Sequence, residues 1–189
     1  MNFFRGRRPV MFWLASLFCC VAFPCAALAI LSILARAPQG LGVRDGRLAP
    51  CPSSPNCVST QAETQQHWIA PLTPASGDEN PIETVATIVA GMQRATIVEQ
   101  SETYLRAEFR SRLFRFCDDV EFFYDRSAGQ IHFRSASRVG HSDLGVNRRR
   151  MEEIRQRLRS ATPRRTEPSH QRAASRQSRE REMAVSSRF

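Results

Sequence analysis

Alternating apolar and polar positions predict a set of β-strands in the middle of the chain. Three segments place mainly apolar residues at every second position, with mostly polar or charged residues between, as in strands with one buried face. The alternating positions are Leu105, Ala107 and Phe109, then Val120, Phe122 and Tyr124, then Ile131, Phe133 and Ser135. Thr96–Gln100 adds a short strand, and the hairpin-length turn Arg126–Gly129 indicates antiparallel pairing. The sequence therefore predicts an antiparallel sheet of three to four strands.

A helical period predicts one helix before these strands and another after them. Asn80-Pro81-Ile82-Glu83 is typical of a helix start, with a capping residue, a proline in the first turn and an acid. The first helix would bury Ile82, Val85, Val89 and Met92, and the second, Gly145–Arg159, would bury Met151, Ile154 and Leu158. Asp143 is the expected N-cap of the second helix. The predicted fold class is α+β, with two helices on one face of a small antiparallel sheet.

An apolar segment precedes the domain and predicts a transmembrane helix over residues 10–35. It contains no charged residue, and as a helix it would span about 39 Å, more than the ~30 Å hydrocarbon core of a bilayer. A long, cleaved signal sequence is the alternative, but the apolar run continues past the small residues Ala27-Leu28-Ala29, which favours a retained anchor. The Arg cluster within residues 1–9 predicts a cytoplasmic N-terminus and an exported domain.

Composition divides the remainder into a linker, a domain and a tail. Residues 36–47, rich in Gly, Pro and Arg, form the predicted linker, and residues 48–159 form the globular α+β domain. Residues 160–189 have almost no large apolar side chains and predict a disordered, Arg-rich tail. Such a tail could bind anionic lipid or nucleic acid, but a solvated tail is the favoured interpretation, and an exported tail argues against nucleic acid.

The net charge of +9 lies at the two ends of the chain. Residues 1–44 hold five Arg and no acid, residues 45–158 hold 14 Arg against 15 acids, and residues 159–189 hold eight Arg against three acids. The domain is therefore near neutral overall, which disfavours a nucleic-acid-binding fold. All 27 basic residues are Arg, which excludes a Schiff-base Lys, a P-loop Lys and a Ser–Lys dyad.

The turn Ser135–Asn147 is the best candidate for a site, because it is rich in hydrogen-bonding residues and joins a predicted strand to a predicted helix. The ligand-binding candidates are Asp118, Asp119, Ser137, Arg138, Ser142, Asp143 and Asn147. Arg138 and the backbone N–H groups at the helix start could together hold a carboxylate or phosphate. The favoured alternative is structural: Arg138 pairs with Asp119, Asp143 caps the helix, and Asn147 binds loop backbone.

Catalysis and metal binding have weaker support in the sequence. Ser137, His141 and Asp143 lie within one turn, too close together to align as a triad drawn from separate elements. His132 and His141 with nearby aspartates match no standard metal-ligand spacing. We therefore predict no catalytic residue, metal or cofactor. A hydrolase using Asp118, Asp119 and the Ser137–Asp143 loop remains the alternative.

Two cysteines, Cys51 and Cys57, flank a Pro-rich loop at the start of the domain. In an oxidising compartment they are disulfide candidates, and a redox role for the pair is the alternative. Cys117 lies in an apolar run and is expected to be a buried, inert thiol.

Three sequence blocks carry a family resemblance. They are Cys51-Pro-x-Ser-Pro-Asn-Cys57-Val-Ser, then Phe116-x-Asp-Asp-Val-Glu-Phe122, then Arg134-Ser-Ala-Ser-Arg-Val-Gly-x-Ser-Asp-x-Gly-x-Asn-Arg-x-Arg-x-Glu152. Together they resemble the Domain of Unknown Function 1499 family. The resemblance covers about residues 48–158, and only Cys117 departs from the apolar residue expected at its position. It implies a bacterial envelope protein, with some plastid relatives and often an N-terminal membrane segment, and it implies no established activity.

Together these observations predict a membrane-anchored envelope protein of the inner membrane, with its domain on the periplasmic side. The Ser135–Asn147 turn would serve a non-enzymatic binding or structural module. Expected partners are the membrane, through residues 10–35, and a small anion, a lipid or an envelope protein.

Overall fold

The computed structural model describes residues 35–112 and 115–161, together with isolated residues between 13 and 30. The predicted N-terminus at residues 1–9, most of the predicted span at residues 10–35 and nearly all of the predicted tail at residues 160–189 lie outside the described residues. Among the described residues, no helix has the length and apolarity needed to cross a bilayer. The anchor, the tail and the topology therefore stay predictions.

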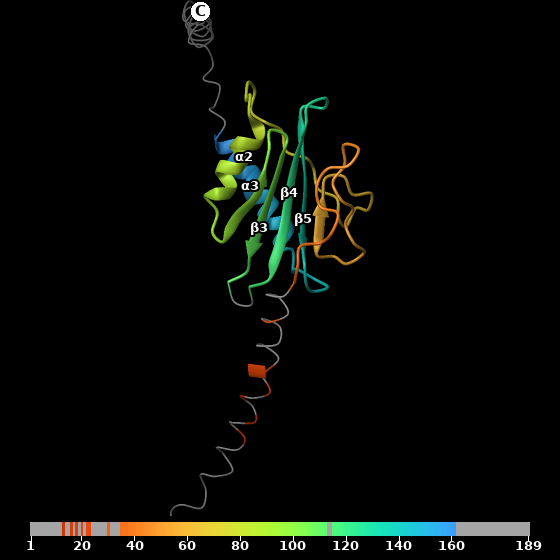
Figure 1. Ribbon diagram of the computed structural model, residues 1–189, viewed down its shortest axis with the longest axis vertical. Coiled ribbons are helices and arrows are strands. Elements are labelled where there is room, and N and C mark those ends of the chain that lie inside the picture. The colour runs from red at the N-terminus through yellow and green to blue at the C-terminus, as the bar shows by residue number, and fades with distance from the viewer. Residues whose placement is uncertain are drawn as a thin grey trace, which may run out of the picture. The chain divides into compact units, whose positions relative to one another are not determined.

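One antiparallel sheet of five strands forms the centre of the domain, in the order β1-β5-β4-β3-β2 (Figure 1). The strands are β1 (Cys57–Ser59), β2 (Ala95–Gln100), β3 (Tyr104–Arg110), β4 (Cys117–Asp125) and β5 (Gln130–Ser137). The prediction of three to four strands was wrong, because it did not include the edge strand β1. This strand has only three residues, all buried, so it offers no alternation to detect, and it pairs with β5 from within the Cys-Pro loop.

Two helices complete the α+β fold, α2 (Pro81–Ala90) and α3 (Val146–Ala161); in Figure 1, α3 lies behind the strands and α2 is seen at the left-hand side of the sheet. Both helices pack against the apolar side chains of the sheet to form one core. It includes Ile82, Val85, Val89, Leu105, Phe122, Phe133, Met151 and Ile154. Asn80 occupies the N-cap of α2, but its side chain makes no capping bond. Asp78 acts there instead, accepting hydrogen bonds from the Asn80 N–H and the Thr84 hydroxyl.

The opposite face of the sheet carries charged residues and is partly covered by the segment that precedes the domain. Glu121 is fully buried there and accepts hydrogen bonds from the Gly42 N–H at 2.6 Å and the Tyr104 hydroxyl at 2.9 Å. Its other oxygen lies 3.5 Å from the Arg134 guanidinium. The segment predicted as a linker therefore packs along this face of the sheet.

Antiparallel pairing brings the C-terminal ends of β3 and β5 and the start of β4 to one end of the sheet. Phe109 pairs with Asp118, and Asp118 pairs with Ser137. We call this the turn end, because the Ser135–Asn147 turn leaves the sheet there and α3 begins there.

Candidate functional site

Asn147, the last residue of the Ser135–Asn147 turn, joins the turn to its surroundings by four side-chain hydrogen bonds and has no exposed surface. Its amide nitrogen donates to the Asn56 carbonyl at 2.9 Å and to the Ser137 hydroxyl at 3.2 Å. Its amide oxygen accepts from the Ser135 hydroxyl at 2.6 Å and from Arg150 at 2.7 Å. Two donors and two acceptors are thus satisfied, and the first turn of α3 is bonded to both β5 and the disulfide loop.

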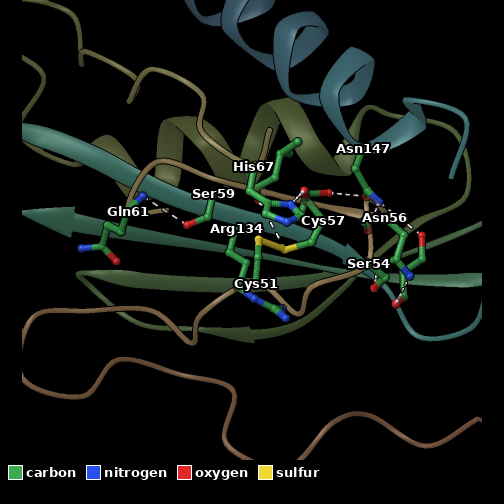
Figure 2. Close-up of a disulfide and its surroundings, with 12 residues drawn as sticks. Cys51, Ser54, Asn56, Cys57, Ser59, Gln61, His67, Arg134 and Asn147 are labelled. Carbon is green, nitrogen blue, oxygen red and sulfur yellow. Dashed lines mark hydrogen bonds between the residues drawn. A yellow bond between two sulfur atoms is a disulfide. The ribbon is translucent and has the colours of Figure 1, made fainter. Parts of the chain in front are cut away.

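Asn56, in the disulfide loop, is also hydrogen-bonded to the turn; dashed lines mark hydrogen bonds of this residue in Figure 2. Its amide donates to the Gly140 carbonyl at 2.6 Å, and its amide oxygen accepts from the Ser54 hydroxyl at 2.7 Å. Asn56 is not among the predicted site residues, although it belongs to a sequence block that carries the family resemblance.

Arg138 closes the other side of the turn by a two-pronged ion pair with Asp119. Its Nε and Nη2 donate to the two carboxylate oxygens at 2.8 and 2.7 Å, and Nη2 also contacts Glu108. Asp119 is only 1% exposed. Burial alone would raise the pKa of Glu108, but the hydrogen bond and charge of Arg138 hold that pKa below its usual value. The predicted internal pair of Arg138 and Asp119 is therefore present.

Asp118 and Asp119 do not share a site, because consecutive residues of a strand point to opposite faces. Asp118 faces α3 and receives a hydrogen bond from Arg150 Nη2 at 2.6 Å. The Arg150 guanidinium also lies over the Phe109 ring, 4.5 Å from its centroid. The prediction that the two aspartates belong to one site was therefore wrong, and Arg150 was not predicted, because its contact with Asp118 depends on how α3 packs.

The remaining candidates make local bonds within the turn. Asp143 accepts from the Gly145 N–H at 2.9 Å and the Asn147 N–H at 2.7 Å, as expected of a helix cap. The Ser142 hydroxyl accepts from the Leu144 N–H at 3.3 Å. His141 is exposed and makes no hydrogen bond to Ser137 or Asp143 within the described part of the chain.

His132 lies apart from the turn on β5, where its Nδ1 contacts the Thr60 hydroxyl at 3.1 Å. Burial lowers the pKa of His132, so the neutral ring is favoured. Across residues 35–112 and 115–161, no three His, Cys, Asp or Glu side chains are placed to hold a metal ion.

A cleft of about 660 Å³ opens at the turn end, between α3 and the segments that precede β2 and follow β3. Six arginines line it, namely Arg94, Arg110, Arg112, Arg149, Arg150 and Arg157. Its only lining carboxylates among the described residues belong to Asp118 and Glu153. We call this the basic cleft. The near-neutral net charge of the whole domain gave no sign of this cleft, because its arginines come from three segments that meet only in the folded chain.

Half of these arginines have no carboxylate partner among the residues that the structure describes. Arg150, Arg157 and Arg110 pair with Asp118, Glu153 and Glu108 at 2.6, 2.7 and 2.8 Å. Arg149 donates to the Leu144 carbonyl and Arg94 to the Gln93 side chain, which leaves their charges uncompensated. Arg112 is exposed and makes no ion pair or hydrogen bond with the residues that the structure describes. The cleft therefore offers a positive potential to an anionic group.

Comparison with known families identifies the domain. A family model described as "Protein of unknown function (DUF1499)" matches residues 47–158, more than half of the chain. The chain belongs to the DUF1499 family. The match spans the disulfide loop, all five strands and most of α3, and it confirms the resemblance seen in the sequence. No curated protein and no solved structure matches the chain.

The cysteines of the DUF1499 domain behave as the sequence predicts. Cys51 and Cys57 form a disulfide, which lies beside His67 and Arg134 in Figure 2. Cys117 is buried, and its burial raises the pKa of the thiol to about 11. The thiol therefore stays protonated and unreactive at neutral pH.

Replacing both Cys51 and Cys57 by Ser should lower the free energy of unfolding by about 2 kcal/mol, since the closed loop is short. Chemical denaturation of the full-length chain measures this change. Wild-type protein treated with a reductant is the control and should match the double variant. Complete loss of the fold would contradict a merely local role for this disulfide.

A second cleft, of about 720 Å³, lies beside the disulfide in the DUF1499 domain. The segments 40–53 and 59–67 line it, and its charged side chains are those of Arg44, Arg47 and Glu63. Arg47 also donates to the Gln61 carbonyl at 3.3 Å. This cleft therefore has a much smaller excess of positive charge than the basic cleft.

Proposed function

We propose that this chain is a membrane-tethered envelope protein whose DUF1499 domain binds an anionic group in the basic cleft without catalysing a reaction. The observation that carries the proposal is the set of three arginines, Arg94, Arg112 and Arg149, that line the cleft without carboxylate partners in the described part of the chain. Guanidinium groups bind phosphate and carboxylate oxygens through paired hydrogen bonds, which suits them to such a site.

We assign the Ser135–Asn147 turn a structural role next to this site rather than a ligand-binding role. Its polar groups already satisfy one another, so a ligand there would have to displace the Arg138–Asp119 pair or the bonds of Asn147. Breaking buried pairs of this kind is costly. The turn instead fixes the start of α3, from which Arg149 and Arg150 reach the cleft.

The proposed tether rests on the apolar residues 10–35 and the Arg cluster before them. The Cys51–Cys57 disulfide agrees with an exported domain on the periplasmic side of the inner membrane, because disulfides persist in oxidising compartments.

No contact of the described residues favours the hydrolase alternative. A catalytic carboxylate must reach a substrate or a water molecule. Both oxygens of Asp119 accept hydrogen bonds from Arg138, and Asp118 is held by Arg150. The Ser137 hydroxyl accepts from Asn147.

Changing Arg94, Arg112 and Arg149 together to Gln should weaken the binding of inorganic pyrophosphate. We expect a loss of roughly 30- to 100-fold in affinity, because each charge near an anionic group contributes on the order of 1 kcal/mol. Titration calorimetry on the full-length chain in a zwitterionic detergent measures the effect. Raising the salt concentration should weaken wild-type binding, since the cleft is open to solvent.

The matched control changes Arg44, Arg126 and Arg159 to Gln, which removes the same charge outside the basic cleft. This control should bind pyrophosphate as the wild type does. Equal loss in both triple variants would indicate unspecific attraction, and no binding by the wild type would contradict the proposed function.

A further inference from the structure

The N-terminal segment joins the domain at the end of the sheet that carries the basic cleft. Arg138 follows β5 at the turn end, and its Nη1 donates to the Ala35 carbonyl at 3.3 Å. In Figure 1 the orange segment that begins the described domain reaches the end where the β3 arrowhead lies. The hairpin between β4 and β5, around Ala128, lies at the opposite end.

This junction is hydrogen-bonded to the domain at two points. Ala35 is the last residue of the predicted span, and Gly42, only a few residues later, is bonded to the buried Glu121. With residues 10–35 as the proposed tether, the turn end is the end of the domain at which the chain leaves it toward the bilayer.

The turn end carries both kinds of side chain that a bilayer surface accepts. Leu144 is 84% exposed and Val146 is 40% exposed; Val146 lines the basic cleft, and Leu144 lies two residues before it. Arg149 donates to the Leu144 carbonyl at 2.8 Å, so a cation lies directly beside the apolar group. Apolar side chains enter the interface while neighbouring arginines bind lipid phosphates, which is the usual pattern of peripheral membrane contacts.

We infer that the basic cleft docks on anionic phospholipid headgroups of the same bilayer that holds the tether. This inference rests on the proposed function and names the ligand of that site. The headgroup phosphate would lie among Arg94, Arg112 and Arg149, and Leu144 would enter the interface. A soluble phosphate compound shares the chemistry but would not bring Leu144 into contact with lipid.

The test uses a single tryptophan as a reporter of contact with lipid. The full-length chain has two tryptophans, which are removed by Trp13→Phe and Trp68→Phe, and Leu144→Trp then places the reporter at the turn end. The protein is reconstituted into vesicles of brominated phosphatidylcholine, with or without phosphatidylglycerol. Ala128→Trp in the same background is the control, because this exposed residue lies at the opposite end of the sheet.

We expect bromine to quench the Leu144→Trp signal in the anionic vesicles and to leave the Ala128→Trp signal unchanged. Without phosphatidylglycerol, the ratio of docked to undocked domain should fall roughly 100-fold. The reason is that three Arg each lose about 1 kcal/mol of attraction to the anionic surface. Changing Arg94, Arg112 and Arg149 to Gln should have the same effect.

Three outcomes would overturn the inference or its basis. Quenching that does not depend on phosphatidylglycerol would exclude docking through charge. Absence of quenching, in protein that still binds pyrophosphate, would refute lipid docking and leave the proposed anion site intact. Failure of the chain to enter either kind of vesicle would contradict the proposed tether itself.

Discussion

Replacing Asn147 by Leu should lower the free energy of unfolding by about 4 kcal/mol, the largest effect expected of any single substitution at the turn. Asn147 has no exposed surface, and all four of its side-chain hydrogen bonds reach buried or half-buried partners. Leucine has a similar volume but leaves those partners unsatisfied in the interior, and each such group costs roughly 1–3 kcal/mol. Urea denaturation of the full-length chain, followed by circular dichroism, measures the change.

Asn80 provides the control for this substitution. It occupies the N-cap of α2, is exposed, and makes no side-chain capping bond. Asn80→Ala should therefore change the stability by less than about 1 kcal/mol. If Asn147→Leu were as mild as Asn80→Ala, the turn could not be held to α3 through this side chain.

Arg138→Gln should destabilise the domain by about 2–4 kcal/mol, because it leaves the buried Asp119 carboxylate without its two-pronged partner. Arg106, 3.9 Å from Asp119, compensates only in part. Arg126→Gln is the control, since it breaks an exposed pair with Glu102 that should be worth less than about 1 kcal/mol.

A second substitution distinguishes loss of the pair from loss of packing. Adding Asp119→Asn to Arg138→Gln removes the stranded charge and should restore part of the lost stability. A double variant that is less stable by the full sum of the two single effects would show that the residues are not coupled. Thermal or urea unfolding of all four proteins completes the cycle.

The same cluster makes stability depend on acid pH. The pKa of Glu108 is held below its usual value in the folded protein, chiefly by Arg138. A lowered folded-state pKa stabilises the fold above the unfolded-state pKa, and this contribution is lost as the pH falls through the folded-state value. Arg138→Gln should reduce that acid sensitivity, which a comparison of unfolding curves at neutral pH and near pH 3 would reveal.

The central strands were predictable because their surroundings are simple. Leu105, Ala107 and Phe109 face the helices, whereas Arg106 and Glu108 face the other side of the sheet. Because alternate residues of the strand are buried, apolar residues recur at every second position of the sequence. β1 shows no such alternation because all of its residues are buried. Its position follows from pairing with β5, which is a tertiary interaction rather than a local pattern.

The local contacts of the turn were also predictable from the sequence. Its caps and its Arg138–Asp119 pair follow from residue types at short spacing, and the structure contains them. The partners Asn56 and Arg150 could not be found in this way, because Asn56 lies 91 residues before Asn147 and Arg150 meets Asp118 only after α3 has packed. The basic cleft likewise exists only in the folded chain.

A nuclear magnetic resonance titration with inorganic pyrophosphate tests the central claim most directly, since it locates the bound anion residue by residue. The full-length chain in a zwitterionic micelle should show amide shifts at Arg94, Arg110, Arg112 and Arg149, around the basic cleft. The second cleft, between residues 40–53 and 59–67, should be unaffected. An unchanged spectrum, or shifts confined to that second cleft, would contradict the account.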